Sequence, residues 1–141
     1  MATLVTGANR GIGRALAERL AHEGPAVVIG ARDAAKGEAA AAAIRGAGHD
    51  ATSVVLDVAS AESVARAARE LEAAGVVVDG EVRGDVLVNA ACPGWVATDM
   101  GGAGAPVSPE EAAAGLAGLL RLPAGGPSGR LFDRHGREVP F

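Results

Sequence analysis

Short apolar runs alternate with helix-forming segments three times within the first 75 residues, and this alternation restricts the fold more than any other feature. Residues 2–6, 26–31 and 52–56 are each a brief run of small or branched apolar side chains, as buried parallel strands are. A segment with a helical apolar stripe follows each run. Strands that alternate with helices build a parallel sheet with right-handed crossovers, so the order predicts a doubly wound α/β fold.

Capping and breaking residues place the ends of the predicted helices. The first helix is expected over 11–23, because a Gly-Pro pair follows it. Asp33 can cap a second helix that ends near residue 45, and Ser60 can cap a third that ends near residue 75. The inner face of the third helix is expected to carry Val64, Ala68 and Leu71.

The second half of the chain is less regular. Residues 76–88 fit either a hairpin or a strand with a loop, and 92–94 interrupt regular structure. Ser108 begins a predicted helix that runs to about residue 121, because Pro follows it directly and Glu stands three positions later. A last strand is expected over 130–132. The single tryptophan, Trp95, is expected in the core.

Composition excludes several classes of partner and site. The chain has 141 residues, enough for one domain, and a net charge of −4 with scattered basic residues, so neither nucleic acid nor a membrane surface is expected as a partner. One cysteine excludes an internal disulfide, and the histidines are far apart in sequence, so no metal site is expected. No signal peptide pattern or apolar run of about 18 residues is present, which makes the cytoplasm the expected location.

A glycine-rich turn lies between the first predicted strand and helix, where a dinucleotide site would be. It reads Thr-Gly-Ala-Asn-Arg-Gly-Ile-Gly over residues 6–13. Glycines let the backbone approach a pyrophosphate, and the helix N-terminus presents unpaired N–H groups and a partial positive charge to the phosphates. A merely tight turn is the alternative, but the flanking strand and helix favour a nucleotide site.

The residue after the second strand bears on the choice of cofactor. An acidic side chain there accepts the ribose hydroxyls of NAD, whereas Arg accommodates the 2′-phosphate of NADP. Arg32 stands at this point, and Arg10 can reach the same side. Asp33 follows, but it is better explained as a helix cap. The sequence therefore favours NADP, with a solvated surface charge as the alternative role for Arg32.

These residues together resemble the short-chain dehydrogenase/reductase family, in particular its NADP-dependent carbonyl reductases. Residues 6–13 look like the family's TGxxxGxG turn, and 31–33 and 56–58 resemble two later cofactor positions. Residues 86–101 are similar to the family's sixth strand and the loop after it. The resemblance extends to Ser-Pro-Glu-Glu at 108–111 and to Gly-Pro-Ser-Gly-Arg-Leu-Phe at 126–132, so it covers residues 2–75 and about 85–141.

The resemblance implies a set of cofactor contacts. Asp57 would hold the adenine edge with Val58 beside it, and residues 93–98 would line the nicotinamide and diphosphate side. The expected NADP-binding residues are Gly7, Asn9, Arg10, Gly11, Ile12, Gly13, Arg32, Asp57, Val58, Pro93, Gly94, Val96 and Thr98. A small carbonyl compound would be the substrate.

The chain departs from the family at the catalytic residues. Family members use Tyr as the proton donor, Lys to lower the pKa of that Tyr, and Ser to position the substrate oxygen. This chain has no Tyr, and its single Lys is Lys36, on the second helix, so no catalytic residue is assigned. About ten residues near 76–84 stand where three strand–helix units, roughly 90 residues, are expected. An internal deletion explains this difference.

The expected architecture is one truncated Rossmann-type domain over 1–141, with a mostly parallel sheet of about five strands. Residues 2–75 form the cofactor-binding half, 76–84 the deletion junction and 85–141 the C-terminal part. Because the deletion would expose an edge of the first strand, 85–89 or 76–78 is expected to pair there; a second chain is the alternative.

Three functions are compatible with the sequence. The first is an NADP(H)-binding, carbonyl reductase-like protein with impaired catalysis. The second is an active carbonyl oxidoreductase that uses another proton donor, water included. The third is a structural role, either as a homodimer or as the partner of a full-length reductase.

Overall fold

The computed structural model describes residues 2–24, 26–76, 89–123 and 125–140. The chain divides into two compact units, residues 1–79 and 80–141. In the described ranges, no helix is both long and apolar enough to cross a membrane.

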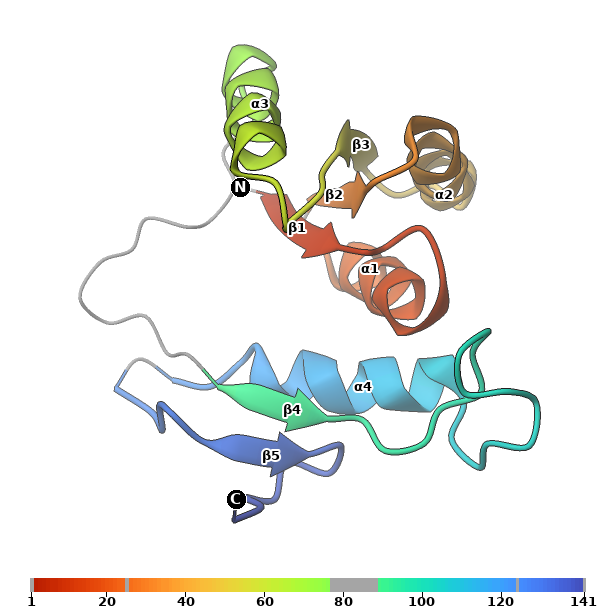
Figure 1. Ribbon diagram of the computed structural model, residues 1–141, viewed down its shortest axis with the longest axis vertical. Coiled ribbons are helices and arrows are strands. Elements are labelled where there is room, and N and C mark those ends of the chain that lie inside the picture. Colours follow the sequence, from red (N-terminus) through yellow and green to blue (C-terminus); the bar gives the residue numbers. More distant parts are fainter. Residues whose placement is uncertain (1, 25, 77–88, 124, 141) are drawn as a thin grey trace. The chain divides into compact units, whose positions relative to one another are not determined.

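The first unit alternates strands and helices throughout, as the sequence predicts (Figure 1). Its elements are β1 (Ala2–Thr6), α1 (Gly11–Glu23), β2 (Ala26–Ala31), α2 (Ala34–Gly46), β3 (Ala51–Val55) and α3 (Ala61–Ala73). The strands form one parallel sheet in the order β1-β2-β3. The register pairs Ala2 with Ala26 and Val27 with Ala51. The doubly wound α/β prediction is therefore confirmed for this part of the chain.

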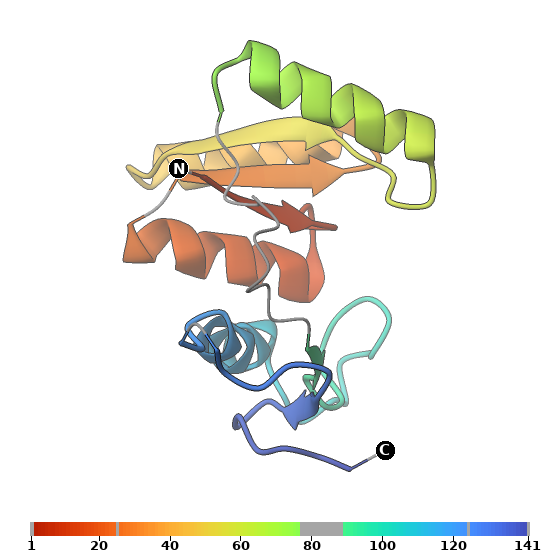
Figure 2. The same cartoon turned by 90° about the vertical axis from the view of Figure 1, so that its left-hand side faces the viewer.

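Helices cover both faces of this sheet (Figure 2). On one face, α1 and α2 pack against β1 and β2 in a core that includes Leu20, Ile29 and Ile44. On the other face, α3 packs through Leu71 against a cluster that includes Val28. The central strand β2 is the most deeply buried, because its Val27, Val28 and Ile29 are fully excluded from solvent. This burial on both faces explains the continuous apolar run of β2.

The described residues of the second unit form a smaller parallel sheet and one helix. Its elements are β4 (Ala90–Cys92), α4 (Pro109–Leu119) and β5 (Leu131–Asp133), and β4 pairs with β5. Ser108 and Glu111 form the predicted capping box: the Glu111 N–H donates to Ser108 Oγ at 3.1 Å, and the Ser108 N–H donates to Glu111 Oε2 at 2.9 Å. Asn89 joins the two strands, because its Oδ1 accepts from the Arg130 N–H at 3.1 Å.

The arrangement of the strands differs from the expected single sheet of about five strands. The five strands of the described residues form a three-stranded and a two-stranded sheet, and β4 pairs with β5 instead of β1. The strand expected over 86–88 lies outside the described residues, as do 77–78 and most of 85–89, which were the candidates for pairing with β1. A periodic pattern indicates that a strand exists but not which strand it pairs with, because pairing depends on contacts distant in sequence.

The inner face of α3 also differs in part from the prediction. Leu71 is buried as expected, but Val64 is 45% exposed and Ala68 is exposed. Ser63 and Ala67 are buried in their place. The helix is therefore rotated by about one residue from the predicted orientation, and Val64 and Ala68 lie toward the side of β1 that faces away from β2.

Candidate nucleotide-binding site

The predicted cofactor residues of the first unit gather at one end of its sheet. Gly7 follows β1, Arg32 follows β2, and Asp57 stands two residues after β3. All three strands are parallel, so their carboxyl ends lie at the same edge. In open α/β sheets, ligands bind outside this edge. The structure thus brings together residues that are 25 to 50 positions apart in the sequence.

The glycine-rich turn has a backbone that other residues would not adopt without strain. Gly7 has φ of +67° and Gly11 has φ of +56°, both in the left-handed region. A Cβ atom on Gly13 would lie only 2.8 Å from the Gly7 carbonyl oxygen, so α1 packs directly on the turn. The Ala8 N–H donates to the Gly30 carbonyl at 3.3 Å and ties the turn to β2. Backbone therefore forms the surface that a diphosphate would approach.

The N-terminus of α1 differs from those of the other helices. Asp33, Ser60 and Ser108 each cap their helix through a side-chain oxygen that accepts from a backbone N–H. Arg10, the N-cap residue of α1, makes no such bond. Among the four helices of the described residues, only α1 lacks a side-chain cap. Its first N–H groups and its helix dipole are thereby directed to the region beyond the glycine turn, where they suit an anion.

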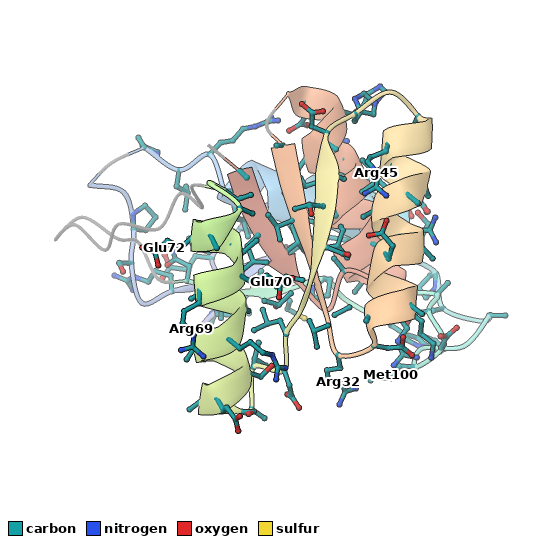
Figure 3. All side chains as sticks on the ribbon, turned by 90° about the horizontal axis from the view of Figure 1, so that it is seen from above. Arg32, Arg45, Arg69, Glu70, Glu72 and Met100 are labelled. Carbon is teal, nitrogen blue, oxygen red and sulfur yellow. The ribbon has the colours of Figure 1, made fainter. Side chains whose placement is uncertain are left out.

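Arg32 and Asp33 have separate roles, as the sequence indicates. Asp33 Oδ1 accepts from the Lys36 N–H at 3.1 Å, and this backbone hydrogen bond lowers the pKa of Asp33. The Asp33 carboxylate is therefore engaged as the cap of α2, which confirms that interpretation. Arg32 is exposed and forms no ion pair with another residue in the described ranges. Figure 3 shows it projecting beyond the end of β2, so its guanidinium can meet a phosphate.

The segment after β3 is held by two hydrogen bonds of Asp57. Asp57 Oδ1 accepts from the Ala59 N–H at 3.0 Å, and the Asp57 N–H donates to Ser63 Oγ at 3.0 Å. Ser63 is 6% exposed, and the sequence analysis did not identify it as part of the site. The sequence signal that could have identified Ser63 is its position three residues after the Ser60 cap. The neighbouring Val58 is 68% exposed, so it offers an apolar surface to a ring.

Four further predicted residues lie in the second unit, in the loop after β4. Pro93 is half-buried, and Gly94 has φ of +83°. Val96 is buried and forms an isolated bridge with Val107, so its side chain contributes to packing. Thr98 Oγ1 accepts from the Gly101 N–H at 3.2 Å, which fixes the loop.

Trp95, in the same loop, is not the core residue that the sequence suggests. It is 60% exposed, and its Nε1 donates to the Gly101 carbonyl at 2.8 Å. The single tryptophan therefore holds a loop on the surface. The indole N–H explains this, because a Trp is favoured where the N–H finds a partner while part of the ring stays in solvent.

The sequence lacks Tyr, the family's proton donor, and its single Lys is Lys36. The Lys36 ammonium lies 3.7 Å from Asp33 Oδ2 on α2 and so belongs to the capped helix. Where the structure is described, no group of three or more His, Cys, Asp or Glu residues could hold a metal ion.

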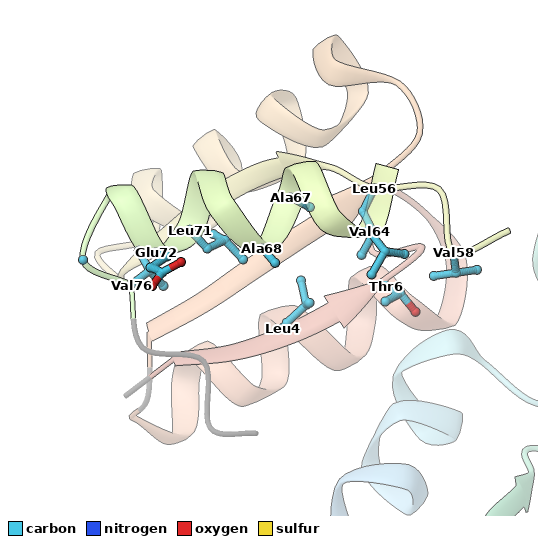
Figure 4. Close-up of a pocket in the computed structure, with 11 residues that line it drawn as sticks. Leu4, Thr6, Leu56, Val58, Val64, Ala67, Ala68, Leu71, Glu72 and Val76 are labelled. Atoms are coloured by element: carbon cyan, nitrogen blue, oxygen red, sulfur yellow. The ribbon is translucent and has the colours of Figure 1, made fainter. Parts of the chain in front are cut away.

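An apolar hollow lies between α3 and the side of β1 that faces away from β2 (Figure 4). Its volume is about 610 Å³. Leu4 and Thr6 line it from β1, and Val64, Ala68 and Leu71 line it from α3. Val58 lies at the end near Thr6, so the hollow adjoins the candidate site. Among the described strands, β1 pairs only with β2, so its other edge borders this hollow.

Comparison with known proteins gives consistent matches to one family. The family model of short chain dehydrogenases matches residues 1–82. Human retinol dehydrogenase 13 is 39% identical over 102 residues, which are 68% of this chain and 29% of that protein. Carbonyl reductase (NADPH) 1 of Oryctolagus cuniculus is 57% identical over 48 residues, 33% of this chain and 17% of that protein.

Solved structures agree with the sequence matches. A metagenomic short-chain oxidoreductase in complex with NADP is 38% identical, with a TM-score of 0.52, over 56% of this chain and 36% of that one. The chain thus spans about a third or less of the length of the proteins it matches.

Proposed function

The chain belongs to the short-chain dehydrogenase family, and on this premise we propose that it binds NADP(H) at the carboxyl edge of the β1-β2-β3 sheet without reducing carbonyl compounds by itself. The observation that carries the proposal is the combination of a glycine turn in backbone contact with α1 and a helix N-terminus without a side-chain cap.

The residues of the first unit fit the parts of the cofactor. Backbone N–H groups around Gly11 and Gly13 would bind the diphosphate, since a side chain on Gly13 would collide with the turn that holds it. Arg32 would pair with the 2′-phosphate, because its guanidinium is exposed while Asp33 is engaged as a cap. Asp57 and Val58 would hold the adenine edge and face. The complex of NADP with a related oxidoreductase supports this preference.

From the family resemblance, Pro93, Gly94, Val96 and Thr98 are predicted to contribute contacts to the nicotinamide. For Val96 this contribution would come from the backbone, because its side chain is buried. When bound, the nicotinamide would supply a hydride; the residues of the chain would orient it but would not deliver a proton to a substrate oxygen.

The proposal of impaired catalysis rests on the groups that carbonyl reduction requires. Carbonyl reduction requires both a hydride and a proton, and a phenol is absent from the sequence. We attribute this absence to an internal deletion near residues 76–84, which would make 1–141 a truncated Rossmann-type domain. The chain matches only a short part of its relatives, which is compatible with a deletion. The cytoplasmic location remains a prediction from the sequence.

Nucleotide fluorescence and absorbance test the two parts of the proposal separately. Adding the protein to NADPH should increase or shift the nicotinamide fluorescence in a saturable manner. Adding a quinone or a diketone should then leave the absorbance at 340 nm unchanged. Loss of that absorbance would instead support the second function, an active oxidoreductase in which water or another group donates the proton.

The apolar hollow favours a structural role as a second candidate function. Among the described strands β1 pairs only with β2, and the backbone groups on its other edge, with the aliphatic side chains beside it, suit a strand from another chain. That chain would be a second copy or a full-length reductase of the same family. Co-elution of the purified protein with such a reductase would support this role. A protein that stays monomeric and does not bind the reductase would exclude it.

A further inference from the structure

Two histidines from distant parts of the sequence meet in the first unit, at the end opposite the candidate nucleotide site. His22 lies in the last turn of α1, and His49 lies in the connection between α2 and β3. Nδ1 of His22 and Nε2 of His49 are 2.8 Å apart. The ring centroids are 4.7 Å apart, with an angle of 67° between the ring planes. The distance along the sequence hid this pair from the sequence analysis.

The scaffold holds both histidines in place. Ala21, which precedes His22, belongs to the core cluster between the sheet and the two helices. The His49 N–H donates to the Ile44 carbonyl at 3.3 Å, and Ile44 belongs to the same cluster. The carbonyl of the residue after His49 accepts from the Val27 N–H at 3.0 Å. The folded core therefore fixes the backbone at both histidines, and a ligand that uses both rings would have only their side chains to order.

We propose that His22 and His49 form a surface site for a divalent transition metal ion. Two nitrogen ligands that are each about 2.0 Å from a metal and at right angles to each other are about 2.8 Å apart. The two imidazoles would thus occupy adjacent positions of a square-planar or octahedral ion. The hydrogen bond between the rings uses one N–H; on metal binding that proton would move to the other nitrogen of its own ring, and both exposed rings would turn so that their lone pairs converge on the ion.

The number of protein ligands indicates which ion suits the site. Within the residues that the structure covers, no cluster of three metal-ligating side chains exists, so water would complete the coordination. Imidazole ligands suit Cu²⁺, Ni²⁺ and Zn²⁺, and planar or octahedral geometry favours Cu²⁺ and Ni²⁺ over tetrahedral Zn²⁺. Mg²⁺ and Ca²⁺ prefer oxygen ligands and are not expected to bind.

Calorimetric titration with Ni²⁺ tests the proposal. The protein should carry no affinity tag and should contain Cys92→Ser, because the Cys92 thiol is exposed and would bind the metal itself. One ion per chain is expected. Either His22→Ala or His49→Ala should weaken binding by about 100-fold, because the second imidazole acts at a high effective concentration. The matched control is His135→Ala, which removes the third histidine of the sequence and should leave binding unchanged.

Equal affinity of the parent protein and either single variant would overturn the proposal, and so would loss of binding in His135→Ala. Circular dichroism should show that each variant folds. A second measurement needs no variant at the site: the electron paramagnetic resonance spectrum of the protein with one equivalent of Cu²⁺. Splitting from two equatorial imidazole nitrogens is expected, and splitting from one or none contradicts the proposed pair.

Discussion

Gly13 is the residue at which the packing of the backbone and the binding of the nucleotide are most closely linked. Its missing side chain lets α1 approach the Gly7 carbonyl, and an added Cβ would lie 2.8 Å from that oxygen. Because the nearest atoms are backbone, the turn itself would have to move. We expect Gly13→Ala to lower the free energy of unfolding by about 1–3 kcal/mol and to abolish measurable NADPH binding.

Urea denaturation and NADPH fluorescence measure these two effects. Gly46→Ala is the matched control, since no atom lies within 4 Å of a Cβ added at Gly46, at the end of α2. Wild-type binding by Gly13→Ala would show that the turn does not hold the phosphates.

Arg32 determines the cofactor preference if the proposed function is correct. Arg32→Ala removes the guanidinium that would pair with the 2′-phosphate, while every contact with NADH would remain. A charged hydrogen bond at an exposed site is expected to contribute about 1.5 kcal/mol, which is roughly tenfold in affinity. We therefore expect NADPH to bind about tenfold more weakly and NADH to be unaffected. Arg69→Ala on α3 is a control for the loss of one positive charge, and an equal effect of both variants would contradict the role of Arg32.

The N-terminal cap of α2 allows the contribution of a single charge to stability to be tested. The hydrogen bond from the Lys36 N–H lowers the pKa of Asp33 below the ordinary value of 3.8. A carboxyl group with a lowered pKa stabilises the fold fully above its unfolded-state pKa, and this contribution is lost as the pH falls through the folded-state value. Unfolding measured from pH 7 down to pH 3 should show this loss in the wild type.

The matched variant for this test is Asp33→Asn, because Asn also caps helices but does not titrate. Its stability should fall less steeply than that of the wild type below about pH 4. Identical slopes would mean that the charge on Asp33 does not contribute to the cap.

Elements defined by local patterns could be predicted closely, whereas pairing and orientation could not. The bounds of β1, α1 and β2 agree with the prediction, and β3 differs by one residue. The caps of α2, α3 and α4 are those expected. These signals are local, because strand runs, caps and breakers act over a few residues.

Features that depend on distant contacts were missed. The division into two sheets, the exposure of Val64 and of Trp95, and the meeting of His22 with His49 have no local signature. At the site, the glycine turn and Arg32 were recognisable from their positions after strands. Ser63 was not, because its bond to the Asp57 N–H exists only once α3 packs on the sheet.

At the scale of the whole molecule, the hollow beside β1 should govern association. Val64 is 45% exposed and lines it, so a charge there would oppose contact with an apolar strand. If the chain associates through this side, Val64→Glu should convert the assembly to monomer. Ala65→Glu places the same charge on α3 outside the hollow and should not. Light scattering coupled to size-exclusion chromatography measures the mass, and equal masses for the two variants would exclude this surface.

Calorimetric titration of the unmodified protein with NADPH, NADH and the 2′-phosphorylated adenosine fragment measures nucleotide binding at the glycine turn. We expect one NADPH to bind per chain, about tenfold more tightly than NADH. The fragment should bind measurably, because Arg32, Asp57 and Val58 lie at the same sheet edge as the glycine turn. If none of the three ligands releases or absorbs heat on mixing, and NADPH fluorescence is equally unchanged, the glycine turn is not a nucleotide site.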